Sequence, residues 1–137
     1  MIYEEQKRRL TVGTGGYHIA HAITADCSLT TGVSDEVFKK FHLTQFMKDI
    51  RGSGITSPDS ILVGRVFNLV TSNPPESPTY DLVRECLRYM KEQCISEGIH
   101  KIAMPKIHEG ILSWERIRED ILNIFEDTTV EILVCTN

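Results

Sequence analysis

Two segments of the chain contain a glycine and lie where a loop between a strand and a helix could bind an anion. Residues 25–33 (ADCSLTTGV) lie between an apolar run and the start of an amphipathic stretch, and residues 105–111 (PKIHEGI) lie in an equivalent position. Backbone amides at strand-to-helix turns, helped by the positive end of the helix dipole, make a natural cradle for phosphate. Together the two segments could grip a diphosphate from two sides.

The residues expected to contact such a ligand share a position beyond the end of an apolar run. They are Asp26, Ser28, Thr30, Thr31, Gly32, Val33, Ser72, Ile107, His108, Gly110, Ile111 and Thr136. Gly32 and Gly110 would let the backbone approach the ligand closely or adopt a positive φ. Each segment alone also fits an ordinary turn between a strand and a helix.

Other chemical motifs fail on spacing. The glycines at 13–16 precede an apolar run and carry no lysine, so they indicate a turn and not a phosphate loop. His18 and His21 are three apart in an expected strand, so they point to opposite faces and cannot share an ion. His108-Glu109 begins like H-E-x-x-H, but Leu112 stands where the second histidine is needed. We expect neither a metal nor a cofactor.

The apolar periodicity predicts strands that alternate with helices. Strands are expected over 17–23, 61–63, 65–70, 101–104 and 130–134. One helix is expected from an N-cap at Ser34 to a stop near Gly52, a second between Pro78 and Gly98, and a third from a cap at Ser113 through Phe125. This order predicts a mostly parallel sheet covered on both faces, with ligands beyond the carboxyl ends of the strands.

Composition fits one globular α/β domain over residues 1–137, with 41% apolar and 25% charged residues. The net charge of −4 argues against a long nucleic-acid footprint. The acidic start is unlike a signal peptide, and the longest uncharged run, Leu10–Ala25, is too short and polar to span a membrane. We expect a cytoplasmic protein whose four cysteines are reduced and mostly buried. The oligomeric state stays open.

Four segments in order resemble the macro domain family. AHAITADCSLTTGVSDEVFKKF is similar to its strand, first loop and helix, and VFNLVT followed by SPTYDLVRECLRYMK resembles the next strand and helix. KIAMPKI, then GILSWERIREDILNIF and VEILVC, resemble the remainder. The resemblance covers nearly the whole chain and is nearest to the branch of terminal ADP-ribose protein glycohydrolases. It implies a three-layer α/β/α sandwich with a mixed sheet, and ADP-ribose or an ADP-ribosylated molecule as the ligand.

The chain departs from that family at the adenosine end and in the first loop. Family members have Gly-Asp after the first strand, and the aspartate holds the adenine amino group. Residues 6–9 here read Gln-Lys-Arg-Arg, without an acid. Where the family has Gly-Ala-Gly in the first loop, this chain has Thr30-Thr31-Gly32. The resemblance therefore implies ADP-ribose binding that is weaker than in the family.

The departures extend to the catalytic groups of the branch. Its lysine follows the strand equivalent to 66–71, where this chain has Ser72 and Asn73, and neither is an amine. Its second loop reads Gly-Cys-Gly-Leu-Asp, whereas residues 108–112 read His-Glu-Gly-Ile-Leu. Glu109 is the nearby carboxylate, and it fits either a catalytic base or a solvated loop charge.

Three interpretations follow for function. The chain binds ADP-ribose or a derivative without the lysine-dependent chemistry, or it is a hydrolase or O-acyl-ADP-ribose deacylase with a rearranged site. In the second case Glu109, His108 or Asp26 would act as base. In the third, the chain is a pseudoenzyme that serves protein interaction. We expect the first, with negligible release of ADP-ribose from glutamate-modified protein.

Overall fold

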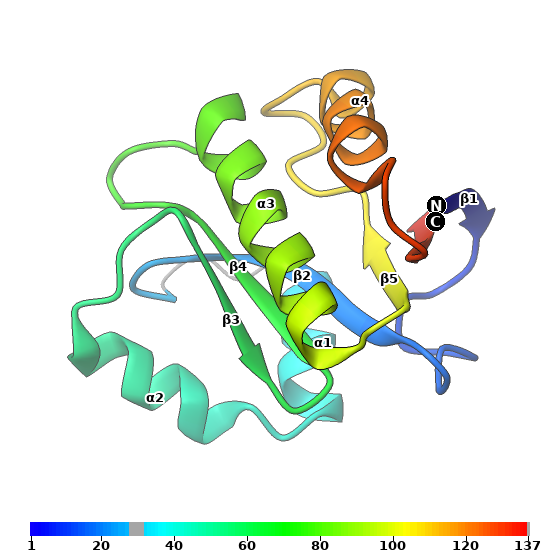
Figure 1. Cartoon of the computed structure of the whole chain (residues 1–137). Helices are drawn as coiled ribbons and strands as arrows, with labels where there is room; N and C mark the ends of the chain where they lie inside the picture. Colours follow the sequence, from blue (N-terminus) through cyan, green and yellow to red (C-terminus); the bar gives the residue numbers. More distant parts are fainter. Residues whose placement is uncertain (28–31, 137) are drawn as a thin grey trace.

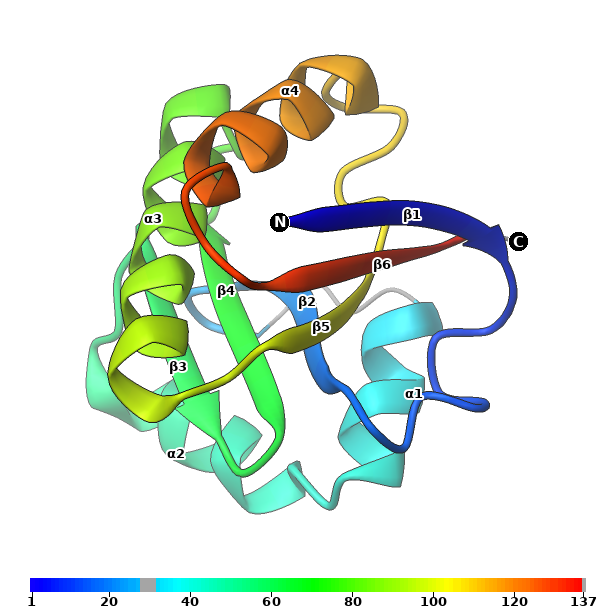
Figure 2. The same ribbon diagram turned by 45° about the vertical axis from the view of Figure 1, so that its right-hand side comes forward.

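The computed structural model describes residues 1–27 and 32–136, and these residues build a six-stranded sheet. The strand order is β1 (Ile2–Lys7), β6 (Glu131–Thr136), β5 (Lys101–Pro105), β2 (His18–Thr24), β4 (Val66–Ser72) and β3 (Asp59–Val63). All neighbouring strands are parallel except β3, which pairs antiparallel with β4 (Figures 1 and 2). The parallel strands therefore end at one edge of the sheet.

Helices cover both faces of the sheet. The helices α3 (Tyr80–Glu97) and α4 (Trp114–Phe125) pack on one face, and α1 (Gly32–Lys40) and α2 (Thr44–Ser53) lie on the other (Figure 1). Each face has its own apolar cluster, because alternate residues of a strand point to opposite sides. In β4, Phe67 and Leu69 join the α3 and α4 cluster, whereas Val66 and Val70 join the other. This arrangement confirms the predicted α/β/α sandwich with a mixed, mostly parallel sheet.

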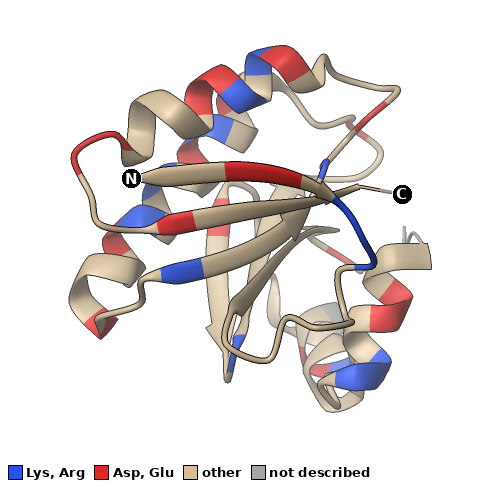
Figure 3. Ribbon diagram, turned by 90° about the vertical axis from the view of Figure 1, so that its right-hand side faces the viewer, with Lys and Arg blue, Asp and Glu red and all other residues tan. Residues whose placement is uncertain are grey.

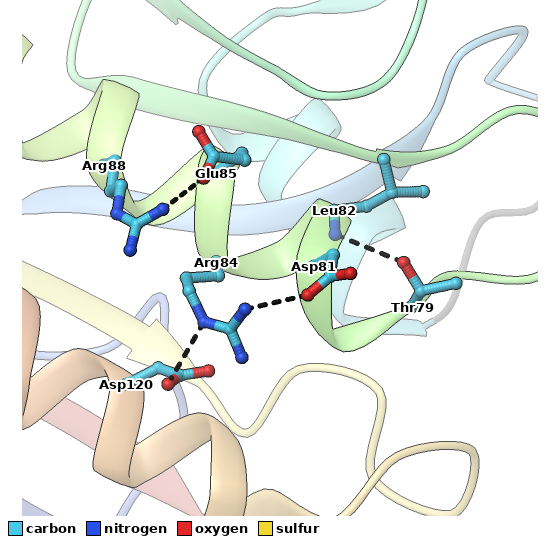
Figure 4. A network of polar contacts seen from close by, with 7 residues as sticks. All are labelled: Thr79, Asp81, Leu82, Arg84, Glu85, Arg88 and Asp120. Carbon is cyan, nitrogen blue, oxygen red and sulfur yellow. Dashed lines mark hydrogen bonds and ion pairs between the residues drawn. The ribbon is translucent and has the colours of Figure 1, made fainter.

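Helix α3 forms as its sequence predicts. Its N-cap residue Thr79 accepts a hydrogen bond from the Leu82 amide at 3.2 Å, which satisfies one of the unpaired amides of the first turn. The Arg84 guanidinium contacts Asp81 at 2.8 Å on its own helix and Asp120 on α4 at 3.4 Å (Figure 4). These contacts link the outer faces of α3 and α4, and the Arg88–Glu85 pair lies one turn further along.

The structure corrects three details of the expected elements. The single helix expected from Ser34 to near Gly52 is two helices, because the chain turns at residues 41–43 and His42 adopts a φ of 56°. Ser34 lies inside α1 and is not its N-cap. Ser113 does hold the N-cap position of α4, but its side chain makes no capping hydrogen bond.

Apolar periodicity did not predict β1. Its residues are mostly exposed and include Glu4 and Glu5, so little alternation of polar and apolar residues marks the strand. Parallel pairing with β6, from Ile2 opposite Glu131 to Lys7 opposite Thr136, holds β1 at the edge of the sheet. Among residues 1–27 and 32–136, no helix has the length and apolar character needed to cross a membrane.

Two glycines provide a matched test of the helix boundaries. Gly98 ends α3 with a φ of 68°. Gly98→Ala should lower the free energy of unfolding by about 1 kcal/mol, because alanine disfavours this left-handed conformation. Gly52 lies inside α2, and a methyl group added there would meet open space. Gly52→Ala should therefore raise that free energy by about 0.5–1 kcal/mol. Urea denaturation measures both, and equal effects would contradict the boundaries.

Candidate functional site

Two adjoining hollows lie at the edge where the parallel strands end. The first has a volume of about 570 Å³ and the second about 380 Å³. They meet at a ridge, defined here as the four residues that line both: Val33, Pro105, Lys106 and Glu109. Helix α1 begins beside this ridge, at Gly32. The arrangement can accommodate one elongated ligand whose middle crosses the ridge.

Most of the predicted ligand-binding residues that the structure describes line these hollows. Gly32 and Thr136 line the first, Val33 lines both, and Ser72, Ile107, His108 and Ile111 line the second. Glu109, the predicted catalytic candidate, lies on the ridge. Ser28, Thr30 and Thr31 fall outside the described residues.

Two predicted residues lie apart from both linings. Asp26 is exposed and its carboxylate accepts a hydrogen bond from the Thr24 hydroxyl at 3.0 Å. Gly110 contributes to neither lining, but its φ of 96° agrees with the second of the two roles expected for it, close approach to the ligand or a positive φ. Gly110 therefore shapes the second loop through its backbone conformation.

The first hollow carries charges of both signs. Arg8 and Arg9, from the segment after β1, lie on one side, and Lys106 belongs to the ridge. Glu36 of α1 faces Arg9, with Arg9 Nη2 and Glu36 Oε1 2.9 Å apart. Figure 3 shows the basic segment beyond β1 beside the first turns of α1. The hollow thus presents hydrogen-bond donors and acceptors together.

A buried polar network forms the floor of the second hollow. His21 of β2 contacts Asn68 Oδ1 of β4 through Nε2 at 2.6 Å and Ser34 Oγ of α1 through Nδ1 at 3.1 Å. Asn68 donates its amide hydrogens to the carbonyls of Ile61 and Val66, so its Oδ1 accepts from His21. The network therefore places the imidazole proton on Nε2 and leaves Nδ1 as the acceptor that faces Ser34.

This network joins three elements at the site. Burial lowers the pKa of His21 to about 4, so its ring is neutral at physiological pH. The Ser34 hydroxyl also lies 3.2 Å from the Ala22 carbonyl oxygen, so its single proton is shared between this carbonyl and His21 Nδ1. These contacts connect the start of α1 to the end of β2. His21 and His18 do point to opposite faces, since His21 packs on Phe38 and His18 on Phe67.

The second loop holds His108 in a left-handed conformation. Its φ is 57°, and its carbonyl oxygen accepts the amides of Ile111 and Leu112 at 3.0 and 2.9 Å. The His108 Nε2 atom lies 2.7 Å from the Thr71 hydroxyl of β4, and burial lowers the pKa of this histidine. The loop is therefore attached to the neighbouring strand end, close to Ser72.

Ser72 and Asn73, which the sequence resemblance places where the branch has its lysine, have different surroundings. Ser72 is buried and lines the second hollow. The Asn73 side chain instead accepts the Ser57 amide at 2.7 Å and donates to the Ser57 carbonyl at 3.3 Å. Asn73 thus ties two loops together, and only Ser72 of this pair lines the hollow.

Lys106 is held between two carboxylates. Its Nζ atom lies 3.8 Å from Glu5 Oε1 of β1 and 3.8 Å from Glu109 Oε2. The Tyr3 hydroxyl donates to Glu5 at 2.6 Å, which lowers the pKa of Glu5 below its usual value, and Trp114 and Arg118 also contact this carboxylate. Glu5 therefore stays charged and keeps the lysine ammonium at the ridge.

Sequence reasoning missed a large part of both linings. The additional residues are Arg8, Arg9, Leu10, Glu36, Pro105, Lys106 and Cys135 in the first hollow and His21, Ala22, Ile23, Thr24, Ser34 and Pro78 in the second. Arg8 and Arg9 could have been identified from the sequence, because they lie in the segment after β1 that lacks the expected acid. No sequence signal marks Glu36, because in the sequence it looks like an ordinary exposed residue of a helix.

Solved structures decide which fold this is. The macrodomain of Thermus aquaticus DarG matches with a TM-score of 0.84 over 99% of both chains, at 15% identity. The macrodomain of Mycobacterium tuberculosis DarG also gives 0.84, over 100% of this chain and 98% of that one, at 14% identity. The chain has the macro domain fold. The predicted resemblance to macro domains is confirmed.

The chain also has curated relatives in sequence. It is 29% identical over 122 residues to the ADP-ribose glycohydrolase OARD1 of Homo sapiens, and the match covers 86% of this chain and 80% of the relative. The Bos taurus protein of the same name matches to the same extent. No family model matches the chain. Within residues 1–27 and 32–136, no group of three histidine, cysteine or acidic residues could hold a metal ion.

The buried imidazole predicts how stability depends on pH. Since the folded-state pKa of His21 lies near 4, below the ordinary value of 6.5, the unfolded chain takes up this proton first as pH falls. The free energy of unfolding should therefore decrease between about pH 6.5 and pH 4, by up to about 3 kcal/mol from this group.

Urea denaturation of the parent and of His21→Gln across this range measures the effect. His21→Gln should be less stable at pH 7 and show a smaller dependence on pH. His100→Gln, a change at an exposed histidine, is the matched control and should keep the parent's dependence. An unaltered slope in His21→Gln would contradict this role of the buried ring.

Proposed function

We propose that residues 1–137 form one macro domain that binds ADP-ribose or an ADP-ribosyl derivative across the two hollows. The observation that carries this proposal is the ridge of Val33, Pro105, Lys106 and Glu109, with one hollow on each side and the start of α1 beside it. A diphosphate linking two bulky groups has the matching shape. The name of the relative OARD1, an ADP-ribose glycohydrolase, supports this choice of ligand.

The sizes of the hollows suggest the direction of the ligand. A base with its ribose needs more room than a lone ribose. The adenosine therefore belongs in the hollow of about 570 Å³ and the distal ribose in that of about 380 Å³. The diphosphate then crosses the ridge. There the Lys106 ammonium and the first turn of α1 provide positive potential, which favours an anion.

The residues of the second hollow support binding without lysine chemistry. Ser72 lines this hollow, and the sequence resemblance places it where the branch has its lysine. Because serine is not an amine, it cannot form a covalent imine-type intermediate with the distal ribose. His108 is hydrogen-bonded to Thr71, and Glu109 is paired with Lys106. We therefore infer that binding, and not the glycohydrolase reaction of the branch, is the activity of this protein.

The proposal extends to the protein's surroundings. The thiols of Cys86, Cys94 and Cys135 are buried, and burial raises their pKa, so they are unreactive and fit a reducing compartment such as the cytoplasm. The net charge of −4 fits a small ligand or a modified protein better than an extended nucleic acid.

Ligand binding should raise the melting temperature, because ADP-ribose stabilises the folded state by mass action. Gly32→Glu should abolish this shift and leave the fold intact. Gly32 lines the first hollow, and an added side chain there meets open space, so the new carboxylate would occupy the hollow and repel the diphosphate. Gly52→Glu on α2 adds the same charge away from the site and should keep the shift.

Differential scanning fluorimetry with up to millimolar ADP-ribose tests both points. Absence of a shift in the parent would overturn the proposed function. Equal binding by the parent and Gly32→Glu would show that the start of α1 does not face the ligand.

Glu109 gives a second test, because its carboxylate lies on the ridge that the diphosphate crosses. Glu109→Gln removes a like charge, so affinity for ADP-ribose should rise about three- to tenfold at low ionic strength and less at high salt. Calorimetry measures this gain. Glu119→Gln on the exposed surface of α4 is the charge-matched control and should leave affinity unchanged. A loss of affinity in Glu109→Gln would show that this carboxylate contributes to binding.

The same variant distinguishes binding from catalysis. A time course with ADP-ribosylated substrate should show negligible turnover by the parent and by Glu109→Gln. Rapid turnover by the parent that is lost in the variant would instead establish a hydrolase with Glu109 as its base.

A further inference from the structure

The rim of the first hollow holds an ion pair between segments far apart in the sequence. Arg9, beyond β1, donates from Nη2 to Glu36 Oε1 of α1 at 2.9 Å, and both residues line the hollow. Both remain accessible to a ligand, with exposed fractions of 65% for the Arg9 side chain and 42% for that of Glu36. Within residues 1–27 and 32–136, Glu36 Oε2 makes no hydrogen bond or ion pair.

The neighbouring arginine has a different role. Arg8 donates to Gln6 Oε1 at 3.1 Å and to the carbonyl oxygens of Val12 and Gly13 at 3.1 and 2.9 Å. The Arg8 guanidinium thus connects the turn at Val12 and Gly13 to the end of β1. The Arg9 side chain makes no hydrogen bond within the described ranges other than the one to Glu36, so several of its donors stay available.

An arginine beside a carboxylate presents a donor and an acceptor next to each other. Adenine offers the complementary pair, because its exocyclic amino group is a donor and the adjacent ring nitrogens are acceptors. A sugar hydroxyl can both donate and accept a hydrogen bond, so it does not require a donor and an acceptor in fixed positions. The chemistry of the rim therefore suits the edge of an aminopurine.

We propose that the Arg9–Glu36 pair reads the base of the ligand: Glu36 Oε2 accepts a hydrogen bond from the exocyclic amino group, and Arg9 donates to a ring nitrogen. This inference rests on the proposed function, since it requires the adenosine in the first hollow. Glu36 thereby supplies from α1 the carboxylate that is missing after β1. Adenine recognition is retained through a different element of the fold.

The test compares ADP-ribose with its 6-deamino analogue, in which purine replaces adenine and no amino group remains. Isothermal titration calorimetry gives the affinity of each ligand for the parent, Glu36→Ala and Glu119→Ala, after circular dichroism confirms that each is folded. Glu119→Ala removes the same charge from the exposed surface of α4. The decisive quantity is the ratio of the two affinities within each protein.

The parent and Glu119→Ala should prefer ADP-ribose about ten- to a hundredfold, the effect of one hydrogen bond to a charged group. Glu36→Ala should reduce this ratio to near one. A purely structural role for the ion pair would weaken both ligands equally and keep the ratio, which would overturn the inference. A parent that binds both ligands equally would also overturn it while supporting the proposed function.

Failure of the parent to bind either ligand would overturn the proposed function and this inference with it. Arg9→Met provides a second variant, because it keeps the aliphatic stem and removes the donors. It should weaken ADP-ribose and the 6-deamino analogue together, since both ligands keep the ring nitrogens. An unchanged affinity of Arg9→Met for both would show that Arg9 does not contact the base.

Discussion

The parallel pairing of the central strands is the constraint on which the rest of this structure depends. Because β2 pairs in parallel with both β4 and β5, and β5 with β6, all four strands must end at the same edge of the sheet. The loops that follow them are brought together there, although they are distant in sequence. Both hollows and the ridge between them are consequences of this edge.

The buried network of His21, Asn68 and Ser34 complements that constraint. Backbone pairing aligns β2 with β4, but it does not determine where the first turn of α1 lies. The His21 imidazole of β2 contacts Asn68 of β4 at 2.6 Å and Ser34 of α1 at 3.1 Å. Satisfied polar groups in a low-dielectric interior are directional, so this network orients α1 more precisely than apolar packing would.

The basic side chains at the site are paired with carboxylates, which weakens their attraction for an anion. Lys106 lies on the ridge, but Glu5 and Glu109 each lie 3.8 Å from it. Similarly, Arg9 in the first hollow faces Glu36. The basic side chains are therefore partly neutralised before any ligand arrives. Specific recognition must then come from the geometry of donors and acceptors and from the start of α1, with a smaller contribution from net charge.

The sequence by itself determined the layered fold and predicted a candidate site at the carboxyl ends of the strands. Apolar periodicity identified β2–β6 and all the helical regions, and the order of strands and helices implied a parallel sheet with a site at its carboxyl edge. It failed at β1, whose exposed residues show no apolar pattern, and at residues 41–43, where a local turn interrupts an otherwise helical spacing.

Only the tertiary structure decided which side chains meet at that edge. Gly32, Val33, Ser72 and His108 could be named from their loops, because a position beyond a strand end is a local property of the chain. Glu36 and Arg9 could not, since they are 27 residues apart and become neighbours only when α1 packs beside the end of β1. Likewise, Asn73 and Ser72 are adjacent in sequence, yet their side chains have different surroundings. Local sequence patterns report periodicity and turns, whereas contacts between distant segments depend on the packing of the whole sheet and its helices.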